Sequence, residues 1–531
     1  IFYLVAFFFF ASPATATENT WIYNGAMAQD EMSPDSGDCK KIEPLGANLV
    51  RYTDYPKGYS VNVPAGLSLD VSFSDICSVW SDSNTRIEIY YDNFANTIND
   101  AETYSGYGKD QIAGARNHQV LADETFWQDN GQVHLLKWNR RALSRVENDK
   151  THYASAEIQK NAQEVYTIFI KSSQPIDNER EIIQSFRLIP RQGTSSFYPR
   201  SLDSQTVMNP ETKAVFTHYF SEKSPLRWGI FEPSAPENFD PLLELEEKLQ
   251  YRFPFLIRYH TLEEKLPYYG LLQAYEQNRL VELTFQTYRA EGDNNGIIYA
   301  ILDGQYDTYL NEYAQKLKEF HHPVLFRLNN EMNGDWCKYS SYYASKDTEL
   351  YKALWRYFHK VFDDNGVDNL IWVWNPHDLS FPDFRWNHGL MYYPGDEYVD
   401  VVGLTGYNTG TYFPGEKWRS FTEAYQPVYD QYTRAFTKPL MITEFGSSSV
   451  GGDKTAWIQD MFRQIPHYPA IKAAIWWSGI DYDEHGVAGR IYKLNETEET
   501  LRAFHDNLKP ATAPKAASTP KAGIEPLLKV K

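Results

Sequence analysis

The second half of the chain contains short apolar runs that alternate with stretches of helical spacing. The runs lie at 226–231, 254–259, 280–287, 323–328, 370–374, 399–404, 439–443 and 471–477. Strands that are apolar on both faces and alternate with helices are typical of a parallel sheet covered on each side. Eight such repeats over roughly 260 residues match a (β/α)8 barrel, in which the active site lies at the carboxyl ends of the strands. We therefore predict an α/β fold with a TIM barrel domain over 214–508.

The first part of the chain has a different period. Apolar and polar residues alternate at 59–63, 85–91, 132–138 and 164–170. This period of two is typical of a half-solvated antiparallel sheet, and the helical spacing of 179–188 predicts a helix across it. We predict a smaller α+β domain over 18–190, without catalytic residues of its own. A glycan-binding module, a spacer and a partner-docking domain all remain open as its role.

The start of the chain has the pattern of an export signal. The apolar run 1–10 is followed by Ala14-Thr15-Ala16, which has the small-x-small form of a signal-peptidase site. The run is too short to span a bilayer. Because it lacks an initiator Met and a basic leader, we expect the first residues to be missing. We predict a signal peptide over 1–17, a buried N-terminal strand being the alternative, and a protein that is secreted or held at the cell envelope.

Two further segments have the composition of connecting chain. Residues 191–213 are rich in Ser, Pro, Arg and Thr, which suits a linker. Residues 509–531 are rich in Ala, Pro and Lys, and we expect them to be disordered. The positive charge of this tail suggests two roles, a tether to an anionic envelope polymer or a solvated extension.

Composition narrows the class of partner. The formal charge of -19 and the pI near 5.2 argue against nucleic acid and anionic membrane surfaces, which attract Lys and Arg clusters. No second apolar stretch has membrane length. Aromatic residues make up 16% of the chain, and flat rings stack on the apolar faces of sugars, although a large core accounts for part of them. A polysaccharide is therefore the expected partner.

The three cysteines do not indicate a catalytic or metal site. Cys39 and Cys77 both lie in the N-terminal part, where a disulfide is plausible in an oxidising compartment. Cys337 has no nearby partner and is expected to be a packed thiol. No His or Cys cluster has zinc spacing. We expect neither a metal nor an organic cofactor.

Two glutamates each follow an apolar run of the predicted barrel. Glu331 follows 323–328 and Glu444 follows 439–443. Ionised oxygens taken out of water need hydrogen-bond or charge partners, so two such placements at one end of a barrel indicate a site. Glycosidic bond cleavage requires paired carboxyl groups, one to protonate the leaving oxygen and one to attack or stabilise the sugar cation. Structural ion pairs are the alternative.

Several motifs of the barrel half resemble glycoside hydrolase family 26, which contains mostly β-mannanases. They lie in order at 327–336, 372–376, 393–400, 406–408 and 443–446. The resemblance covers about 220–505 and does not extend to the N-terminal domain. It implies a retaining enzyme that acts by double displacement, with Glu331 as acid/base and Glu444 as nucleophile. We predict an endo-β-glycanase, with cleavage from chain ends left open as the alternative.

The same resemblance assigns polar residues around the nucleophile. It implies that Arg327 keeps Glu444 ionised by charge-assisted hydrogen bonds and that Tyr407 hydrogen-bonds it. A barrel-floor ion pair for Arg327 and a core position for Tyr407 are the alternatives. Asn330 stands where the family usually has histidine, and in related families the amide at this position bonds the sugar 2-hydroxyl.

Aromatic residues of these motifs are the expected sugar platforms. Trp336 and one of Trp476 and Trp477 should line the mouth, because adjacent strand residues face opposite ways. Trp374, within the 372–376 motif, is a further supporting or substrate-binding candidate.

The sequence departs from the family at positions that bear on the substrate. Besides Asn330, Thr405 replaces an aspartate and 337–340 replace an aromatic cluster. Mannan, glucan and xylan therefore all remain candidate substrates. The alternatives are hydrolysis of the producer's own exopolysaccharide and a catalytically silent glycan-binding barrel.

Overall fold

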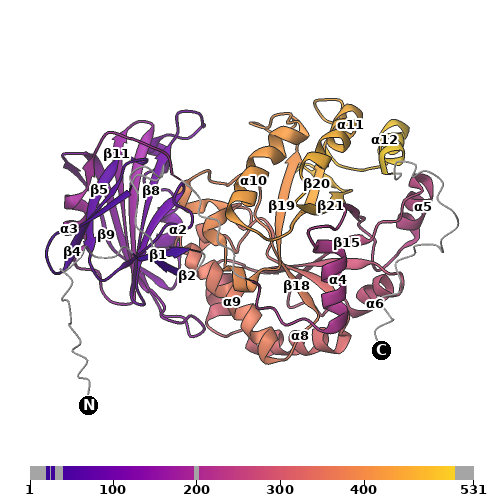
Figure 1. Ribbon diagram of the computed structural model, residues 1–531, viewed down its shortest axis with the longest axis horizontal. Coiled ribbons are helices and arrows are strands. Elements are labelled where there is room, and N and C mark those ends of the chain that lie inside the picture. Colours follow the sequence, from indigo (N-terminus) through magenta and orange to yellow (C-terminus); the bar gives the residue numbers. More distant parts are fainter. Residues whose placement is uncertain (1–19, 24–25, 30–39, 196–202, 509–531) are drawn as a thin grey trace, which may run out of the picture.

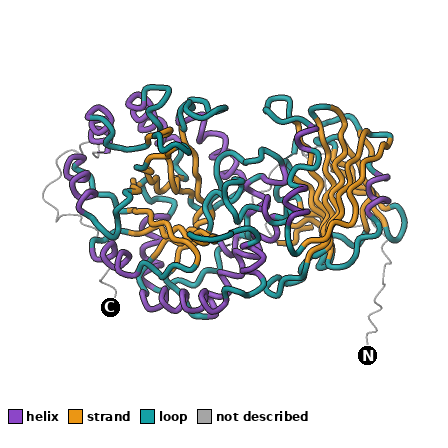
Figure 2. Tube along the Cα trace, turned by 180° about the vertical axis from the view of Figure 1, so that it is seen from behind, coloured by secondary structure: helices purple, strands orange, loops and turns teal. Residues whose placement is uncertain are grey.

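The computed structural model describes residues 20–23, 26–29, 40–195 and 203–508. The predicted leader, the tail, Cys39 and part of the predicted linker lie outside these residues. The described chain forms two lobes that lie side by side (Figure 1). One is built from long strands, and the other is a ring of strands enclosed by helices (Figure 2).

The N-terminal lobe contains two sheets. A nine-stranded sheet has the order β2-β1-β6-β7-β8-β12-β11-β10-β9, and a four-stranded sheet has the order β13-β5-β4-β3. The strands are β1 Thr20–Tyr23, β2 Ala26–Gln29, β3 Lys40–Pro44, β4 Leu49–Asp54, β5 Tyr59–Pro64, β6 Ser68–Asp70, β7 Cys77–Ser81, β8 Thr85–Asn93, β9 His118–Gln128, β10 Gly131–Arg140, β11 His152–Asn161, β12 Glu164–Ser172 and β13 Arg187–Leu188. The short helices are α1 Ala101–Tyr104, α2 Lys109–Gly114 and α3 Glu179–Ser185.

The large sheet is buried on both faces at its centre, and the expectation of one solvated face was wrong there. Ile168 of β12 packs toward the four-stranded sheet, whereas Phe169, one residue on, belongs to the cluster that continues into the barrel. Among the strands of this sheet whose side-chain burial the structure describes, the edge strand β9 is the one that remains largely exposed. The reason is that the barrel lobe covers the second face, which a local pattern of residues does not encode.

The C-terminal lobe is a closed barrel of eight parallel strands in the order β14 to β21. The strands are β14 Arg227–Phe231, β15 Phe255–Leu262, β16 Leu280–Arg289, β17 Val324–Leu328, β18 Leu370–Trp374, β19 Val401–Asn408, β20 Leu440–Ser447 and β21 Ile471–Trp477. This confirms the predicted barrel and each of its eight strands. A small hairpin, β22 Ile480–Tyr482 and β23 Ala488–Ile491, follows the last strand.

Helices cover the outside of the barrel. They are α4 Pro210–Phe220, α5 Asp240–Leu249, α6 Tyr268–Glu276, α7 Ile297–Leu302, α8 Asp307–Phe320, α9 Thr348–Asp364, α10 Phe421–Ala435, α11 Lys454–Gln464 and α12 Glu498–Leu508. Helix α9 illustrates why they form: the Asp347 side chain caps its first turn, and Leu354 and Phe358 repeat on the buried face. Helix α4 begins inside the stretch predicted as linker, where Asn209 caps it and bonds the barrel segment at Asp368.

Strand alternation divides the barrel into an inside and an outside. Leu325, Val373 and Met441 fill the interior, whereas Phe326 and Trp372 point outward under the helices. Toward the mouth the interior positions become polar, and strands β19 and β20 continue further than their apolar runs indicated. Among the described residues, no helix has the length and apolar character needed to span a membrane.

Candidate active site

The two predicted catalytic glutamates meet at the carboxyl-terminal mouth of the barrel. Glu444 lies within β20, and Glu331 lies in the turn that follows β17. Asn329 and Glu331 have φ values of 56° and 53°, in the left-handed region that side chains other than glycine rarely adopt. The Glu331 amide donates to the Asn375 carbonyl at 2.9 Å, which holds the turn in place. Strain of this kind, roughly 1–3 kcal/mol per residue, is often concentrated at functional sites.

Glu444 is buried and accepts hydrogen bonds from three side chains. Arg327 donates from Nη1 at 3.2 Å and Asn330 from Nδ2 at 3.3 Å, both to Oε1. The Tyr259 hydroxyl donates to Oε2. Such donors favour the charged form of a carboxylate. Arg327 thus makes the contact with Glu444 that its predicted role requires, whereas a bond from the Asn330 amide to a sugar hydroxyl stays a prediction.

The sequence interpretation missed Tyr259 and gave its hydrogen bond to Tyr407. The register of β19 against β20 explains the difference, because it pairs Thr405 with Glu444 and Tyr407 with Gly446. Tyr407 therefore sits further toward the mouth, with its ring 4.9 Å from that of Tyr492. Tyr259 follows the interior positions of β15, and this alternation was a signal in the sequence that could have identified it.

A second residue that the sequence interpretation missed is Glu282 of β16. It is fully buried, and its Oε1 lies 2.6 Å from Nε of Arg327. Burial raises the pKa of the Glu282 carboxyl to about 8, with the charge of Glu444 adding to the effect and Arg327 opposing it. A proton on Glu282 near neutral pH leaves the positive charge of Arg327 available to Glu444.

Glu331 has a different environment from Glu444. Its Oε2 accepts from the Trp336 indole at 3.3 Å, and its Oε1 lies 3.8 Å from Nε2 of His377. Burial raises the pKa of Glu331 to about 7, and the charge of Glu444 adds to this, while His377 and Arg327 act against it. A substantial fraction of Glu331 therefore carries a proton near neutral pH, as a general acid requires.

The paired tryptophans of β21 face opposite ways. Trp477 is half-buried, stacks on Phe231 at 5.3 Å and lies 6.4 Å from Tyr407 in the mouth. Trp476 points outward and donates from its indole to the Tyr492 carbonyl at 2.8 Å. Trp477 is therefore the platform candidate of the two. Trp336 remains 49% exposed beside Glu331 and keeps its predicted place at the mouth.

The prediction that Trp374 contacts or supports substrate is corrected by its position. Val373 points into the barrel, so Trp374, the next residue of β18, points outward. It is fully buried, with ring centroids of Tyr393 at 5.1 Å and Phe436 at 6.0 Å. It stabilises the outer layer and has no access to the mouth.

The cysteines are buried thiols where they are described. Cys77 and Cys337 are free, and burial raises the pKa of the Cys77 thiol to about 12. Cys39 is outside the described residues, so its pairing with Cys77 stays a prediction. Within the described part of the chain, no group of three or more His, Cys, Asp or Glu residues could hold a metal ion.

The structure has a closed parallel barrel with two carboxyl groups at its carboxyl-terminal mouth. The pKa of Glu331 is raised, and Glu444 accepts hydrogen bonds from three side chains. This is the arrangement of the (β/α)8 glycosidases. Residues 280–463 match the model of glycosyl hydrolase family 26. The resemblance expected from the sequence motifs is thereby confirmed.

Relatives with named activities match part of this chain. Endoglucanase H of Acetivibrio thermocellus is 32% identical over 213 residues, which cover 39% of this chain and 22% of that protein. Mannan endo-1,4-β-mannosidase of Bacillus subtilis is 38% identical over 171 residues, which cover 30% of this chain and 42% of that protein. The chain thus spans less than half the length of these relatives. A solved GH26 β-mannanase from Bacteroides ovatus is 16% identical, with 56% of this chain and 93% of that chain covered and a TM-score of 0.44.

Proposed function

We propose that the barrel is a retaining glycoside hydrolase that cleaves β-linked polysaccharide internally. The observation that carries the proposal is the opposite environment of the two mouth carboxyls. Burial raises the pKa of Glu331 to about 7, whereas Glu444 accepts three hydrogen bonds, one of them from Arg327. Carboxyl groups whose environments differ in this way take the acid and nucleophile roles in glycosidases.

The first step uses both groups at once. Glu331 donates its proton to the glycosidic oxygen as the bond from that oxygen to the anomeric carbon breaks. Glu444 attacks the anomeric carbon from the other side and forms a glycosyl ester. The leaving sugar departs with the proton, so Glu331 becomes a carboxylate as Glu444 loses its charge.

The second step returns both groups to their starting state. The ester at Glu444 no longer carries the charge that raised the pKa of Glu331. Glu331 therefore accepts a proton from water, and the resulting nucleophile attacks the anomeric carbon and breaks the ester bond. Two inversions give net retention of the β-configuration.

The mouth and the relatives support the proposed substrate class. Trp336 and Trp477 offer partly exposed rings suited to the apolar faces of sugars. The relatives named above include a mannanase and an endoglucanase. Asn330 bonds both Glu444 and Gln286, so its amide is fixed where a sugar bound next to Glu444 would meet it. We place mannan and glucomannan first, followed by mixed-linkage glucan and xylan.

The test is release of reducing ends from these four polymers by wild type, Glu331→Gln and Glu444→Gln. Both substitutions keep shape and hydrogen-bonding capacity, so we expect the fold to persist and turnover to fall by about a thousandfold or more. Glu319→Gln, on the exposed side of α8, is the control and should act like wild type. NMR of the first-formed product should show the β-anomer, and viscosity should fall early if cleavage is internal. Wild type that folds but cleaves none of the polymers, or gives the α-anomer, contradicts the proposal.

We also propose that the protein acts outside the cell or at the envelope, because polymers of this size do not enter cells. The apolar start and the small-x-small site at 14–16 support this. The measurement is the N-terminal sequence of the protein recovered from the culture fluid of an expressing host. An uncleaved chain found only inside the cells would contradict export.

A further inference from the structure

A hollow of about 590 Å³ lies where the N-terminal lobe meets the barrel loop that follows β17. On the N-terminal side it is lined by residues of the segment 103–111 and of strands β9 and β10. On the barrel side it is lined by Tyr342. Its volume is within the roughly 300–1,000 Å³ of ligand sites, which occur preferentially at domain interfaces.

Tyr107 is held on a tight turn at the edge of this hollow. Gly106 and Gly108, on either side of it, have φ values of 71° and 78°, in the left-handed region that favours glycine. The Gly106 amide donates to Glu157 at 2.8 Å, and a Cβ added at Gly108 would lie 3.4 Å from the Lys346 side chain. The turn therefore packs directly on the barrel and fixes the position of the Tyr107 ring.

Tyr107 and Tyr342 form an aromatic pair across the domain boundary. Their ring centroids are 5.5 Å apart, and the rings are inclined at 49°. Both side chains are partly exposed, and among the described residues neither hydroxyl has a hydrogen-bond partner. A tyrosine ring with a free hydroxyl offers an apolar face and a polar group together, and a sugar ring presents the same combination.

The other lining groups divide into paired charges and free neutral groups. Asp123 contacts both Lys109 and Nε2 of His134, and Nδ1 of His134 lies 3.0 Å from Glu157. Exposed neutral side chains for which the described part of the chain holds no partner are Ser105, Gln111 and Thr125. The exposed Asp110 on the same wall would repel an anion. The lining therefore suits a neutral ligand with many hydroxyl groups.

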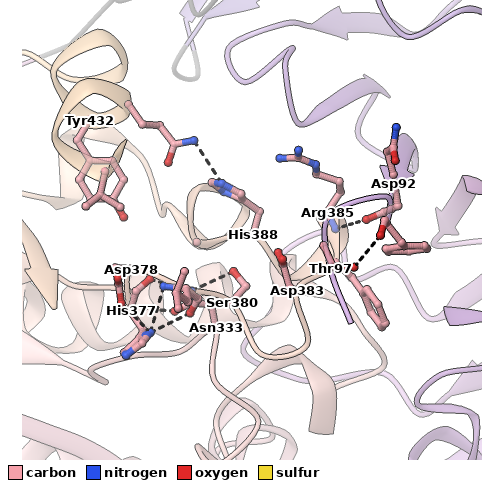
Figure 3. A pocket seen from close by; sticks show the side chains of 17 residues that line it. Asp92, Thr97, Asn333, His377, Asp378, Ser380, Asp383, Arg385, His388 and Tyr432 are labelled. Carbon is pink, nitrogen blue, oxygen red and sulfur yellow. Dashed lines mark hydrogen bonds and ion pairs between the residues drawn. The ribbon is translucent and has the colours of Figure 1, made fainter. Parts of the chain in front are cut away.

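Direct contacts between the domains hold Tyr107 in place relative to the barrel. Lys346, in the loop after β17, lies 3.1 Å from Glu157, which also accepts from the Tyr107 turn. Figure 3 shows a neighbouring interdomain cavity of about 240 Å³, where the Arg385 amide donates to Asp92 at 2.8 Å. A binding surface that is ordered before the ligand arrives loses less conformational entropy on binding.

A series of aromatic residues connects the hollow with the catalytic mouth. The ring of Tyr343 is 4.9 Å from that of Tyr342, and its hydroxyl donates to the Asp335 carbonyl at 2.7 Å. Trp336, the next residue, is 49% exposed and donates to Glu331 at 3.3 Å. The hollow is therefore one loop away from the proposed catalytic acid, and a polymer that extends from the mouth over this loop reaches it.

We propose that this hollow is a second glycan-binding site, in which Tyr107 and Tyr342 provide the surface for a sugar ring of the polysaccharide and Thr125 hydrogen-bonds its hydroxyls. The inference rests on the proposed hydrolase function for the identity of this polymer. Binding at the mouth makes binding at the hollow intramolecular, which raises the affinity for long chains above that for short ones. The N-terminal domain then holds the polysaccharide near the catalytic pair.

The test compares Tyr107→Ala and Thr125→Val with Phe216→Ala, which removes a partly buried ring of α4 outside the hollow. Each is combined with Glu444→Ala, which removes the proposed nucleophile. Calorimetry then measures binding of mannan, glucomannan, mixed-linkage glucan and xylan, and of β-1,4-linked manno- and cello-disaccharides. We expect Tyr107→Ala to weaken polymer binding about tenfold and Thr125→Val about threefold, with little change for the disaccharides.

Kinetics of the enzyme with Glu444 intact provide a second measurement. The KM for the polymer should rise by the same factors in Tyr107→Ala and Thr125→Val. An aryl β-disaccharide is too short to span both sites, so its kcat/KM should be similar in the variants and in the Phe216→Ala control.

The outcomes separate this inference from the proposed function. If Tyr107→Ala and Thr125→Val match Phe216→Ala with every polymer, the hollow is not a glycan site. A loss of affinity that is equal for polymers and disaccharides would place Tyr107 in the mouth and also overturns the inference. If wild type cleaves none of the polymers, the proposed function fails, but polymer binding that Tyr107→Ala weakens still supports the second site.

A chain that binds none of the polymers overturns the second site as well. Melting temperatures equal to that of wild type show that the variants are folded. If Tyr107→Ala melts lower, Thr125→Val decides, because it changes an exposed side chain.

Discussion

Two buried clusters of charged residues, one in the barrel mouth and one between the domains, differ in their balance of charge. In the mouth, Arg327 is the cation within contact of Glu282 and Glu444. Between the domains, Lys171 contacts Glu88 at 2.9 Å and Asp347 at 2.7 Å, and its side chain is fully buried. Burial removes the charged groups of both clusters from water at a cost in free energy. Only in the cluster between the domains do the cations balance the carboxylates.

Arg86 and Lys352 complete the balance of the interface cluster. Arg86 lies 2.6 Å from Glu88 and 3.1 Å from Glu349, which Lys352 also contacts at 2.7 Å. Burial by itself would raise the pKa of the Glu88 carboxyl, but Lys171 and Arg86 outweigh it, and the pKa is lowered. The pKa of Glu349 lies well below its usual value, since Arg86 and Lys352 likewise outweigh burial.

The mouth shows the other outcome. Burial raises the pKa of Glu282 to about 8 and that of Glu331 to about 7, and a single guanidinium does not offset it. Buried carboxyls that contact enough cations therefore remain charged and join the domains. Carboxyls with too few cations nearby keep their protons, which the proposed chemistry uses. The ratio of cations to carboxyls thus distinguishes the interface cluster from the carboxyls that we propose to be catalytic.

Removing Arg327 from the mouth or Lys171 from the interface cluster should give the largest effects. The first should lower activity and the second should lower stability. We expect Arg327→Met to lower kcat by roughly a thousandfold, because Glu444 loses its charged donor. Lys171→Met, in contrast, should lower the free energy of unfolding by about 3–5 kcal/mol, since it leaves Glu88 and Asp347 buried with less compensation. Steady-state kinetics and urea unfolding of both variants provide the measurement. Equal loss of stability with intact kcat in both would remove the distinction between the clusters.

The stability of the two clusters should also respond to pH in opposite directions. The pKa of Glu331 is raised from 4.5 to about 7. Its contribution to the free energy of unfolding is therefore fully present below pH 4.5 and is lost as pH rises through 7. Glu331→Gln should therefore gain roughly 2–4 kcal/mol over wild type at pH 8.5 and little at pH 5, at about 1.4 kcal/mol per unit. The lowered pKa of Glu88 means that its contribution is present above its ordinary pKa and lost as pH falls through the lowered one. Unfolding curves from pH 3 to 9 test both signs, and a Glu331→Gln gain that does not depend on pH would refute the first.

The hydrogen bond to the nucleophile allows a finer test. We expect Tyr259→Phe to lower kcat by roughly 10- to 100-fold, because it removes one of three donors to Glu444. Tyr407→Phe should change kcat less, since the Tyr407 ring lies against Tyr492. The measurement is kcat of both variants. Their melting temperatures, which should equal that of wild type, show that both are folded. A larger loss at Tyr407 would show that substrate binding exchanges the two tyrosines.

The adjacent tryptophans of β21 give a smaller contrast of the same kind. Trp477→Ala should raise KM by about tenfold through the loss of a sugar platform in the mouth, with little change in stability. Trp476→Ala should cost about 3–5 kcal/mol of stability, because it empties a site packed against Phe445 and Phe504. Oligosaccharide kinetics and thermal unfolding distinguish the two. The reverse result would mean that the strand faces are assigned incorrectly.

The smallest expected effect concerns His377. Its charge lowers the pKa of Glu331, so His377→Gln should move the basic limb of the kcat/KM profile from about pH 7 to higher pH, by a fraction of a unit. The acid must be protonated to act, so activity falls as pH rises through this pKa. A pH–rate profile of wild type and variant is sufficient. A limb that moves to lower pH would remove His377 from the electrostatics of the acid.

Much of the barrel was predictable because its signals are local. Each strand from β14 to β21 is an apolar run whose period and length are determined by neighbouring residues. The shared location of Glu331 and Glu444 was predictable because each follows such a run, and the fold brings all carboxyl ends of parallel strands to one edge. Alternation also indicated that only one of Trp476 and Trp477 faces the mouth.

The same alternation also indicates interior residues that were not predicted. Interior positions of β15 lead to Tyr259, and those of β16 lead to Glu282, yet neither was predicted. Trp374 was assigned to the site although Val373, its neighbour, is the interior residue. These errors came from motif resemblance, which identifies a segment without the direction of each side chain.

The sequence by itself determined two domains of different class, eight barrel strands and the acidic pair, because hydrophobic period and residue type act over a few residues. Only the tertiary structure decided which groups bond Glu444, since strand register sets Tyr259 beside it and moves Tyr407 beyond it. It also decided that both faces of the large sheet are buried and that Asp92 lines a cavity beside the barrel mouth. Register, the charge balance of buried clusters and the docking of two domains depend on residues far apart in the chain, and no local pattern records them.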